Sequence, residues 1–99
     1  MKKKPSELIQ PNIEGVKEKL FMSTEDSDDD LYLMKLHIEA LAELDETLNR
    51  RFYPGEAALI VAEDISYALA AFKYENPIDL LIPSHIQKDI NKIRFVPGF

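Results

Sequence analysis

The side chains that could do chemistry in this 99-residue chain are few and lie far apart. There are two histidines, His37 and His85, and no cysteine. The sequence lacks an H-E-x-x-H pair, so a transition-metal site would depend on carboxylates alone. Three widely spaced glycines do not make a phosphate-binding loop, and no G-x-S-x-G segment presents a serine nucleophile. We therefore expect no enzyme activity, no catalytic residue and no bound cofactor.

The remaining polar residues do not suggest a catalytic group either. Glu63 and Asp64 are adjacent, so on a helix their side chains point in different directions and do not form an acid–base pair. Serines are present, but the sequence places no base beside any of them. His37 lies next to an apolar stripe, where a packed histidine is more common than a ligand.

The most acidic segment, S-T-E-D-S-D-D-D at residues 23–30, has the alternating aspartates of a calcium-binding loop. A loop of this kind that began at Asp26 would need glycine at its sixth position and glutamate at its twelfth. Leu31 and His37 occupy those positions. The spacing argues against calcium, and we predict no metal site.

The same acidic residues are well suited to begin a helix. Ser27 and Asp30 have the spacing of a capping box, with aspartate in place of the usual Glu or Gln. The aspartates at positions 28–30 fall in the first turn, where the helix dipole favours negative charge. We predict a solvent-exposed helix start in front of a long apolar-periodic segment.

Apolar periodicity predicts a chain made of helices. We expect a short helix after Pro11, a long one over 31–52, a third from Glu56 to Asn76, and a fourth that is capped by Ser84 and ends near Arg94. In the fourth helix Ile86, Ile90 and Ile93 are predicted to share one face. The fold class is therefore all-α, a small bundle of three to four helices with a long central helix and an extended C-terminal tail. Residues 1–12 are expected to form a flexible arm, 13–95 a single helical domain, and 96–99 the tail.

The long helix is predicted to carry two adjoining apolar stripes, so it needs neighbours on two sides. The first comprises Leu31, Met34, Ile38, Leu41, Leu48 and Phe52, and the second Leu33, Leu36, Ala40 and Leu44. Asp45 interrupts the first stripe and is expected at its edge or paired with a cation. In the third helix Val61, Ile65, Ala68 and Phe72 are predicted to pack against the long helix in an antiparallel pair.

The charge balance bears on possible partners. The net charge is −6 and the only basic run is Lys2-Lys3-Lys4, whereas proteins that grip nucleic acid use clustered Lys and Arg. No apolar run approaches the length of a membrane span, and the start lacks the apolar core of a signal peptide. We expect no specific DNA binding, no membrane contact, and synthesis in the cytosol.

Several short motifs follow one another in a recognisable order. They are V-K-E-K-L at 16–20, D-D-D-L at 28–31, Y-E-N at 74–76, I-P at 82–83 and R-F at 94–95. This order resembles that of the small head-tail connector (adaptor) proteins of long-tailed bacteriophages, over roughly residues 13–96. The chain departs from that family in the short connection at 53–56, and in having arginine before the aromatic residue near its end.

The resemblance implies a structural protein of the virion at the head–tail junction, made in the cytoplasm of a bacterial host. Such a protein forms a ring under the portal, extends the DNA channel, and joins the head to neck or tail components. Its implied partners are other copies of itself, the portal protein and a neck or tail completion protein. DNA would pass through the channel without specific binding, because an acidic lining repels it.

A ring needs two different contact patches on each subunit. The candidate interface residues are the second stripe of the long helix and the apolar tail, namely Leu33, Leu36, Leu44, Phe95, Val96 and Phe99. The alternative is a small acidic helical module that inhibits or regulates a host protein through residues 25–30. An inhibitor would stay small in solution and bind a basic protein in a salt-sensitive way.

Overall fold

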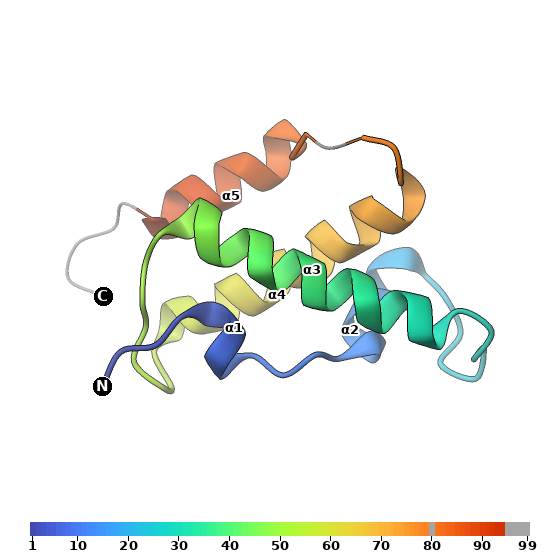
Figure 1. Ribbon diagram of the computed structural model, residues 1–99, viewed down its shortest axis with the longest axis horizontal. Coiled ribbons are helices and arrows are strands. Elements are labelled where there is room, and N and C mark those ends of the chain that lie inside the picture. The colour runs from blue at the N-terminus through green and yellow to red at the C-terminus, as the bar shows by residue number, and fades with distance from the viewer. Residues whose placement is uncertain (80, 95–99) are drawn as a thin grey trace.

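The computed structural model describes residues 1–79 and 81–94, and these form five helices (Figure 1). They are α1 (Pro5–Leu8), α2 (Ile13–Leu20), α3 (Asp30–Leu48), α4 (Ala57–Glu75) and α5 (Ser84–Arg94). In the described part of the chain there is no strand, only an isolated antiparallel bridge between Lys3 and Phe52. The prediction of an all-α fold is confirmed. The fifth helix, α1, is a single turn in the segment predicted as an arm.

Helices α3 and α4 form the centre of the fold and run in opposite directions (Figure 1). Helix α4 contacts all four other helices. It does so through buried small residues, Ala58, Ala62, Ser66 and Ala70, spaced four apart so that they share one face of the helix. Small side chains let neighbouring backbones approach closely.

The hydrophobic core has two parts that share α3 and α4. The buried residues of the first part are Ile9, Leu41, Leu44, Leu48, Phe52, Ala58, Ala62, Ile65, Ile86, Ile90 and Ile93. The second part contains Val16, Leu33, Leu36, Ala40, Leu69, Ala70 and Ala71. The three isoleucines predicted to share one face of the last helix are all buried, which confirms that prediction.

The predicted stripes of the long helix are only partly correct. The second stripe is fully buried, whereas Leu31 and Ile38 of the first stripe are 90% and 52% exposed. On α4, Ile65 is buried but Val61 is 43% exposed. The helical periodicity is confirmed, but the buried face of α3 is rotated toward the small residues of α4, where close approach is possible.

Helix α3 ends at Leu48, four residues earlier than predicted. Asn49 follows in the left-handed conformation with φ of 48°, and its N–H donates to the carbonyl of Asp45. Asparagine tolerates this conformation and is a common helix terminator. Beyond it, Phe52 is fully buried and exchanges two backbone hydrogen bonds of 2.8 Å with Lys3.

The N-terminal residues, expected as a flexible arm, lie against the domain in this structure. Pro5 and Ile9 are buried, and α1 contacts both α3 and α4. Asp45 accepts hydrogen bonds from the backbone N–H of Ser6, at 2.9 Å, and from its hydroxyl. The carboxylate that interrupts the apolar stripe thus holds the N-terminal segment, a partner the sequence pattern did not indicate.

The predicted capping box at the start of α3 is wrong. The helix begins at Asp30 with Asp29 as its N-cap, and no side chain caps it. Ser27 contributes only its carbonyl, which accepts from the N–H of Asp30 at 3.3 Å. The acidic side chains before α3 have other partners, described below.

Candidate functional site

A histidine and a serine meet in the interior, between α3 and α4. Both His37 and Ser66 are fully buried, with 2.8 Å between His37 Nε2 and Ser66 Oγ. The backbone N–H of Asn12 donates to His37 Nδ1 at 2.9 Å, and the Ser66 hydroxyl donates to the carbonyl of Glu63 at 2.6 Å. The fold thus brings a histidine beside a serine, a pairing that the sequence pattern did not indicate. The two residues are 29 positions apart on different helices, so no local pattern could pair them.

The donors and acceptors around His37 fix its tautomer. Nδ1 accepts a hydrogen bond from the backbone N–H of Asn12, so the imidazole hydrogen must sit on Nε2, which then donates to Ser66 Oγ. A base that activates a serine must accept the hydroxyl proton at the nitrogen facing it. Here the hydroxyl donates to a carbonyl instead. The pair satisfies hydrogen bonds and does not have the arrangement of a nucleophile and its base.

Burial also keeps His37 neutral, because removal from water lowers its pKa from the usual 6.5. The ring of Tyr67 lies against the imidazole with 4.9 Å between centroids. His37 therefore links three elements: the N-cap of α2 at Asn12, α3, and α4 through Ser66.

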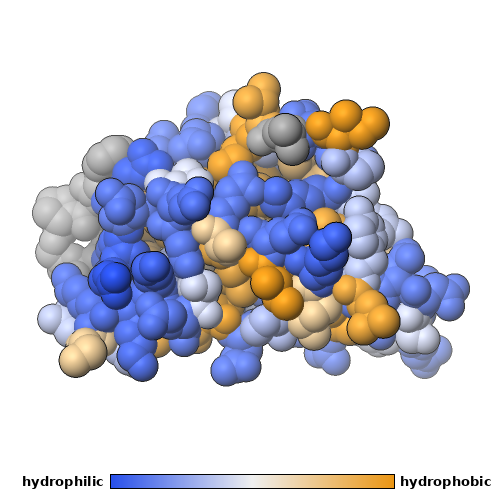
Figure 2. Space-filling model, viewed as in Figure 1, coloured by the Kyte–Doolittle hydropathy of each residue, from blue (hydrophilic) through white to orange (hydrophobic). Residues whose placement is uncertain are grey.

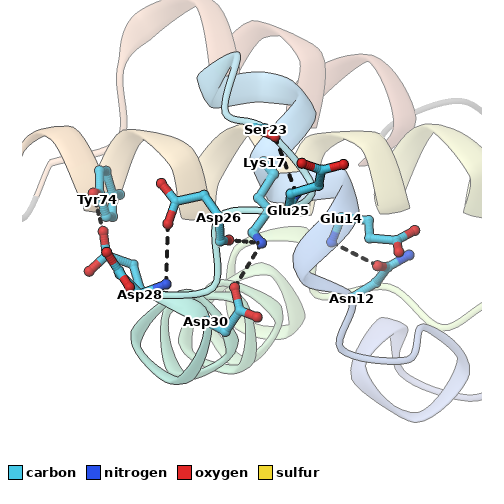
Figure 3. A network of polar contacts seen from close by, with 10 residues as sticks. Asn12, Glu14, Lys17, Ser23, Glu25, Asp26, Asp28, Asp30 and Tyr74 are labelled. Atoms are coloured by element: carbon cyan, nitrogen blue, oxygen red, sulfur yellow. Dashed lines mark hydrogen bonds and ion pairs between the residues drawn. The ribbon is translucent and has the colours of Figure 1, made fainter.

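The acidic segment before α3 is organised by a buried lysine (Figure 3). Lys17 of α2 is only 2% exposed, and its ammonium lies 2.7 Å from Asp30 Oδ1. The same ammonium donates to the backbone carbonyl of Asp26. On the other side of the segment, the hydroxyl of Tyr74 donates to Asp29 Oδ2 at 2.7 Å, which raises the pKa of that tyrosine. Lys17 and Tyr74 thus hold the segment between α2 and α4.

The remaining acids in this segment face solvent. Glu25, Asp26 and Asp28 are exposed, and none of the three makes an ion pair with another described residue. The segment forms one extremity of the molecule, at the right of Figure 1. We call these three side chains the acidic end.

Basic side chains gather at the opposite extremity. The bridge between Lys3 and Phe52 holds the N-terminal segment, with Lys2, Lys3 and Lys4, beside the segment that contains Arg51. These two segments lie at the left of Figure 1. All four cations are exposed, and within the described residues none of them forms an ion pair. We call these four side chains the basic end.

Further contacts fix the basic end to the body of the fold. Arg50, beside it, pairs with Glu56 and donates to the carbonyl of Ile93 at 2.5 Å. Arg94 donates to the carbonyl of Thr47. The connection between α3 and α4 is therefore tied to the end of α5 as well as to the N-terminal segment. The domain measures 42 × 25 × 18 Å, with opposite charges toward opposite ends of its long dimension.

An apolar ridge runs along the outside of α3. It contains Leu31, Met34, Ile38 and Ala42, which follow the helical period. Leu31 and Ile38 are 90% and 52% exposed. Apolar side chains form a strip across this face of the molecule (Figure 2). Charged or polar side chains are usual at such positions, so the ridge is a candidate contact surface.

The interface residues suggested from the sequence have a different location. Leu33, Leu36 and Leu44 are at most 5% exposed and belong to the core, so in this fold they do not offer a surface to a partner. These leucines lie on the buried face of α3. The apolar ridge lies on the adjoining face of the same helix, which is exposed. Phe95, Val96 and Phe99 lie outside the described residues.

Within residues 1–79 and 81–94, no group of three or more histidine or carboxylate side chains could hold a metal ion. No helix of the same residues is long and apolar enough to cross a membrane. No family model, curated protein or solved structure matches the chain.

Proposed function

We propose that this chain is a structural connector that assembles into a ring at the head–tail junction of a long-tailed bacteriophage. The observation that supports the proposal most directly is the collection of opposite charges at opposite ends of one small domain. A ring forms when one patch on each subunit binds a different patch on the next and the rotation closes. The acidic end and the basic end are two such unlike patches.

The order of motifs along residues 13–96 supports a location at the phage neck, through its resemblance to that of head-tail connector proteins. In this proposal the ring lies under the portal protein and extends the DNA channel toward the neck or tail completion protein. The apolar ridge on α3 is the surface offered to one of those neighbouring components. A net charge of −6 suits a channel through which DNA passes without being held.

The proposal is tested by sedimentation of the purified protein with DNA-filled heads that carry the portal protein. We expect the protein to sediment in a fixed ratio of many copies per particle, and heads that lack the portal are the control. Light scattering of the protein alone reports whether the ring forms before it meets the head. Protein that remains in the supernatant at every concentration would contradict the connector proposal.

One observation favours a second candidate, an acidic module that binds a basic host protein. The buried Lys17 holds the segment that carries Glu25, Asp26 and Asp28 and leaves these three side chains exposed. Such a module would remain a monomer or dimer and would bind its partner less tightly as salt is raised. The same sedimentation and light-scattering measurements distinguish the two candidates.

A further inference from the structure

Phe21 combines two properties that are rarely found together. It is 96% exposed, and its backbone is in the left-handed region with φ of 58°. It ends α2: its own N–H donates to the carbonyl of Glu18, and the N–H of Met22 donates to the carbonyl of Lys17 at 2.9 Å. This is the Schellman arrangement, in which the residue at the position of Phe21 is usually glycine.

Elsewhere the described chain follows the usual rule for positive φ. The other two described residues with this backbone are Asn49 and Gly55, the residue types that tolerate it. A bulky aromatic residue is disfavoured in the left-handed region, and its exposed ring contributes no packing in the monomer. Phe21 thus weakens the helix end it occupies, and its ring, almost wholly exposed, gains no compensating packing from the other described residues. A contact outside the domain would supply the missing interaction.

The surroundings of Phe21 indicate the kind of contact. It immediately precedes the segment that bears the acidic end, so an exposed ring and unpaired carboxylates lie on the same short stretch, residues 21–28. Aromatic anchors surrounded by polar groups are typical of the residues that dominate binding energy at protein interfaces. The partner should therefore present cations beside a surface that accepts an aromatic ring.

The basic end of the same chain has those properties. It carries four cations that form no ion pair within the described residues, and one of them lies over an exposed aromatic ring: the ammonium of Lys2 is 5.2 Å from the centre of Tyr53. The two ends lie at opposite extremities of the domain, so one molecule cannot join its own ends. Two copies can join them head to tail, and each copy then keeps one free end for a further copy.

We propose that Phe21 and the acidic end of one copy dock on the basic end and Tyr53 of the next copy, with Phe21 as the anchor. This contact rests on the proposed ring function and identifies the surfaces that would close the ring. Charge complementarity brings the ends together and sets their orientation, and burial of the Phe21 ring then slows dissociation.

The first test replaces Phe21 with asparagine, which tolerates the left-handed backbone. We expect Phe21→Asn to unfold at a higher denaturant concentration than the wild type. Its affinity for self-association should fall by about tenfold or more. A merely structural role would move stability in the opposite direction. Ile60→Ser, which alters a 74% exposed apolar residue of α4 outside both ends and outside the ridge, is the matched control and should associate as the wild type does.

The second test reverses the charges. Lys3→Glu, Lys4→Glu and Arg51→Glu together leave one cation and three carboxylates at the basic end, which reverses its charge. Asp26→Lys with Asp28→Lys leaves one carboxylate and two cations at the acidic end, which reverses that charge as well. Each multiple variant alone should lose self-association, and an equimolar mixture of the two should recover it, because every contact in the mixture again joins opposite charges. A mixture that fails to associate would overturn the contact.

Paramagnetic labelling can detect a weak contact between copies. The chain has no cysteine of its own, so a single introduced cysteine carries the label at one defined position. Spin-labelled Arg51→Cys, mixed at millimolar concentration with an isotope-labelled copy, should broaden the amide signals of residues 21–28 in that copy. Absence of this broadening would overturn the contact. If Phe21→Asn self-associates as the wild type does while the wild type binds phage heads, the contact is refuted and the connector function stands; if the wild type never binds heads, the connector function fails whatever the labelling shows.

Discussion

Two buried polar side chains, His37 and Lys17, fix the relative positions of α2, α3 and α4. Their hydrogen bonds and ion pair are directional, whereas apolar packing is not. His37 joins the start of α2 to α4, and Lys17 joins α2 to the start of α3. Each contact depends on one protonation state, so both have measurable consequences at the level of single residues.

The stability of the protein is expected to depend on His37 as the pH is lowered. Its pKa is lowered in the folded state by burial, so the unfolded chain takes up this proton at a higher pH than the folded chain does. The free energy of unfolding should therefore fall as the pH drops below about 6.5, and the fall should stop below the folded-state pKa. Protonation would also place an N–H at Nδ1, against the backbone N–H of Asn12.

Urea unfolding of the wild type and of His37→Gln across pH about 7 to 5 checks this prediction. The glutamine variant should lose less unfolding free energy over that range than the wild type, since it lacks the titrating group. His85→Gln, at an exposed position on α5, controls for the replacement of a histidine in general. Identical pH dependence in the wild type and His37→Gln would show that His37 does not contribute.

Lys17 is expected to stabilise the acidic segment at residues 23–30 more than an exposed lysine would, because it is buried. Lys17→Met should lower the free energy of unfolding by about 1–3 kcal/mol, because Asp30 and the carbonyl of Asp26 lose their donor. Hydrogen exchange should increase in residues 23–30. Lys19→Met is the matched control, since the ion pair of Lys19 with Asp64 is exposed and worth little. Equal losses in the two variants would contradict the assigned role.

The elements themselves were largely predictable, because helical periodicity and helix terminators are local. The segments that became α2, α3, α4 and α5 were anticipated, and Ile86, Ile90 and Ile93 were placed correctly on the inner face of α5. Helix α1 was missed because four residues carry no period. The face that α3 buries was assigned incompletely, because the choice between two adjoining stripes depends on which neighbours are small.

The pairings were not predictable, because they join residues far apart in the sequence. Lys3 with Phe52, His37 with Ser66 and Lys17 with Asp30 each depend on how helices pack. The contact surface was not predictable for the same reason. The residues suggested on α3 belong to the core, and the basic end exists only because the N-terminal segment lies beside residues 49–52. Phe21 was not singled out, because phenylalanine is not a residue expected to end a helix.

Gly15 shows how tertiary packing reverses a local preference. Alanine there should favour helix α2 by up to about 1 kcal/mol. A Cβ at this position would instead lie 2.5 Å from the ring of Tyr67. We therefore expect Gly15→Ala to lower the free energy of unfolding by about 1–3 kcal/mol in denaturant titrations.

The double variant with Tyr67→Ala isolates the cause of that loss. With the ring removed, the alanine at position 15 should be neutral or stabilising, because only the helix preference remains. A loss of the same size in both backgrounds would show that the Tyr67 ring is not the reason for the glycine.

On the scale of the whole molecule, the charged ends and the apolar ridge should respond differently to salt. The cations of the basic end and the carboxylates of the acidic end are exposed, so their attraction is screened as the Debye length falls from about 10 Å at 0.1 M salt to about 3 Å at 1 M. Contacts through Leu31 and Ile38 depend on burial of apolar surface, which salt does not screen.

We therefore expect high salt to weaken self-association, measured by sedimentation velocity, while single copies still bind portal-bearing heads through the ridge. Ile38→Asp should have the converse effect, with self-association retained and head binding reduced about tenfold or more. The two perturbations separate a contact between copies from a contact with a different component. If both surfaces served the same partner, salt and Ile38→Asp would reduce self-association and head binding together, and the division of tasks between the ends and the ridge would be wrong.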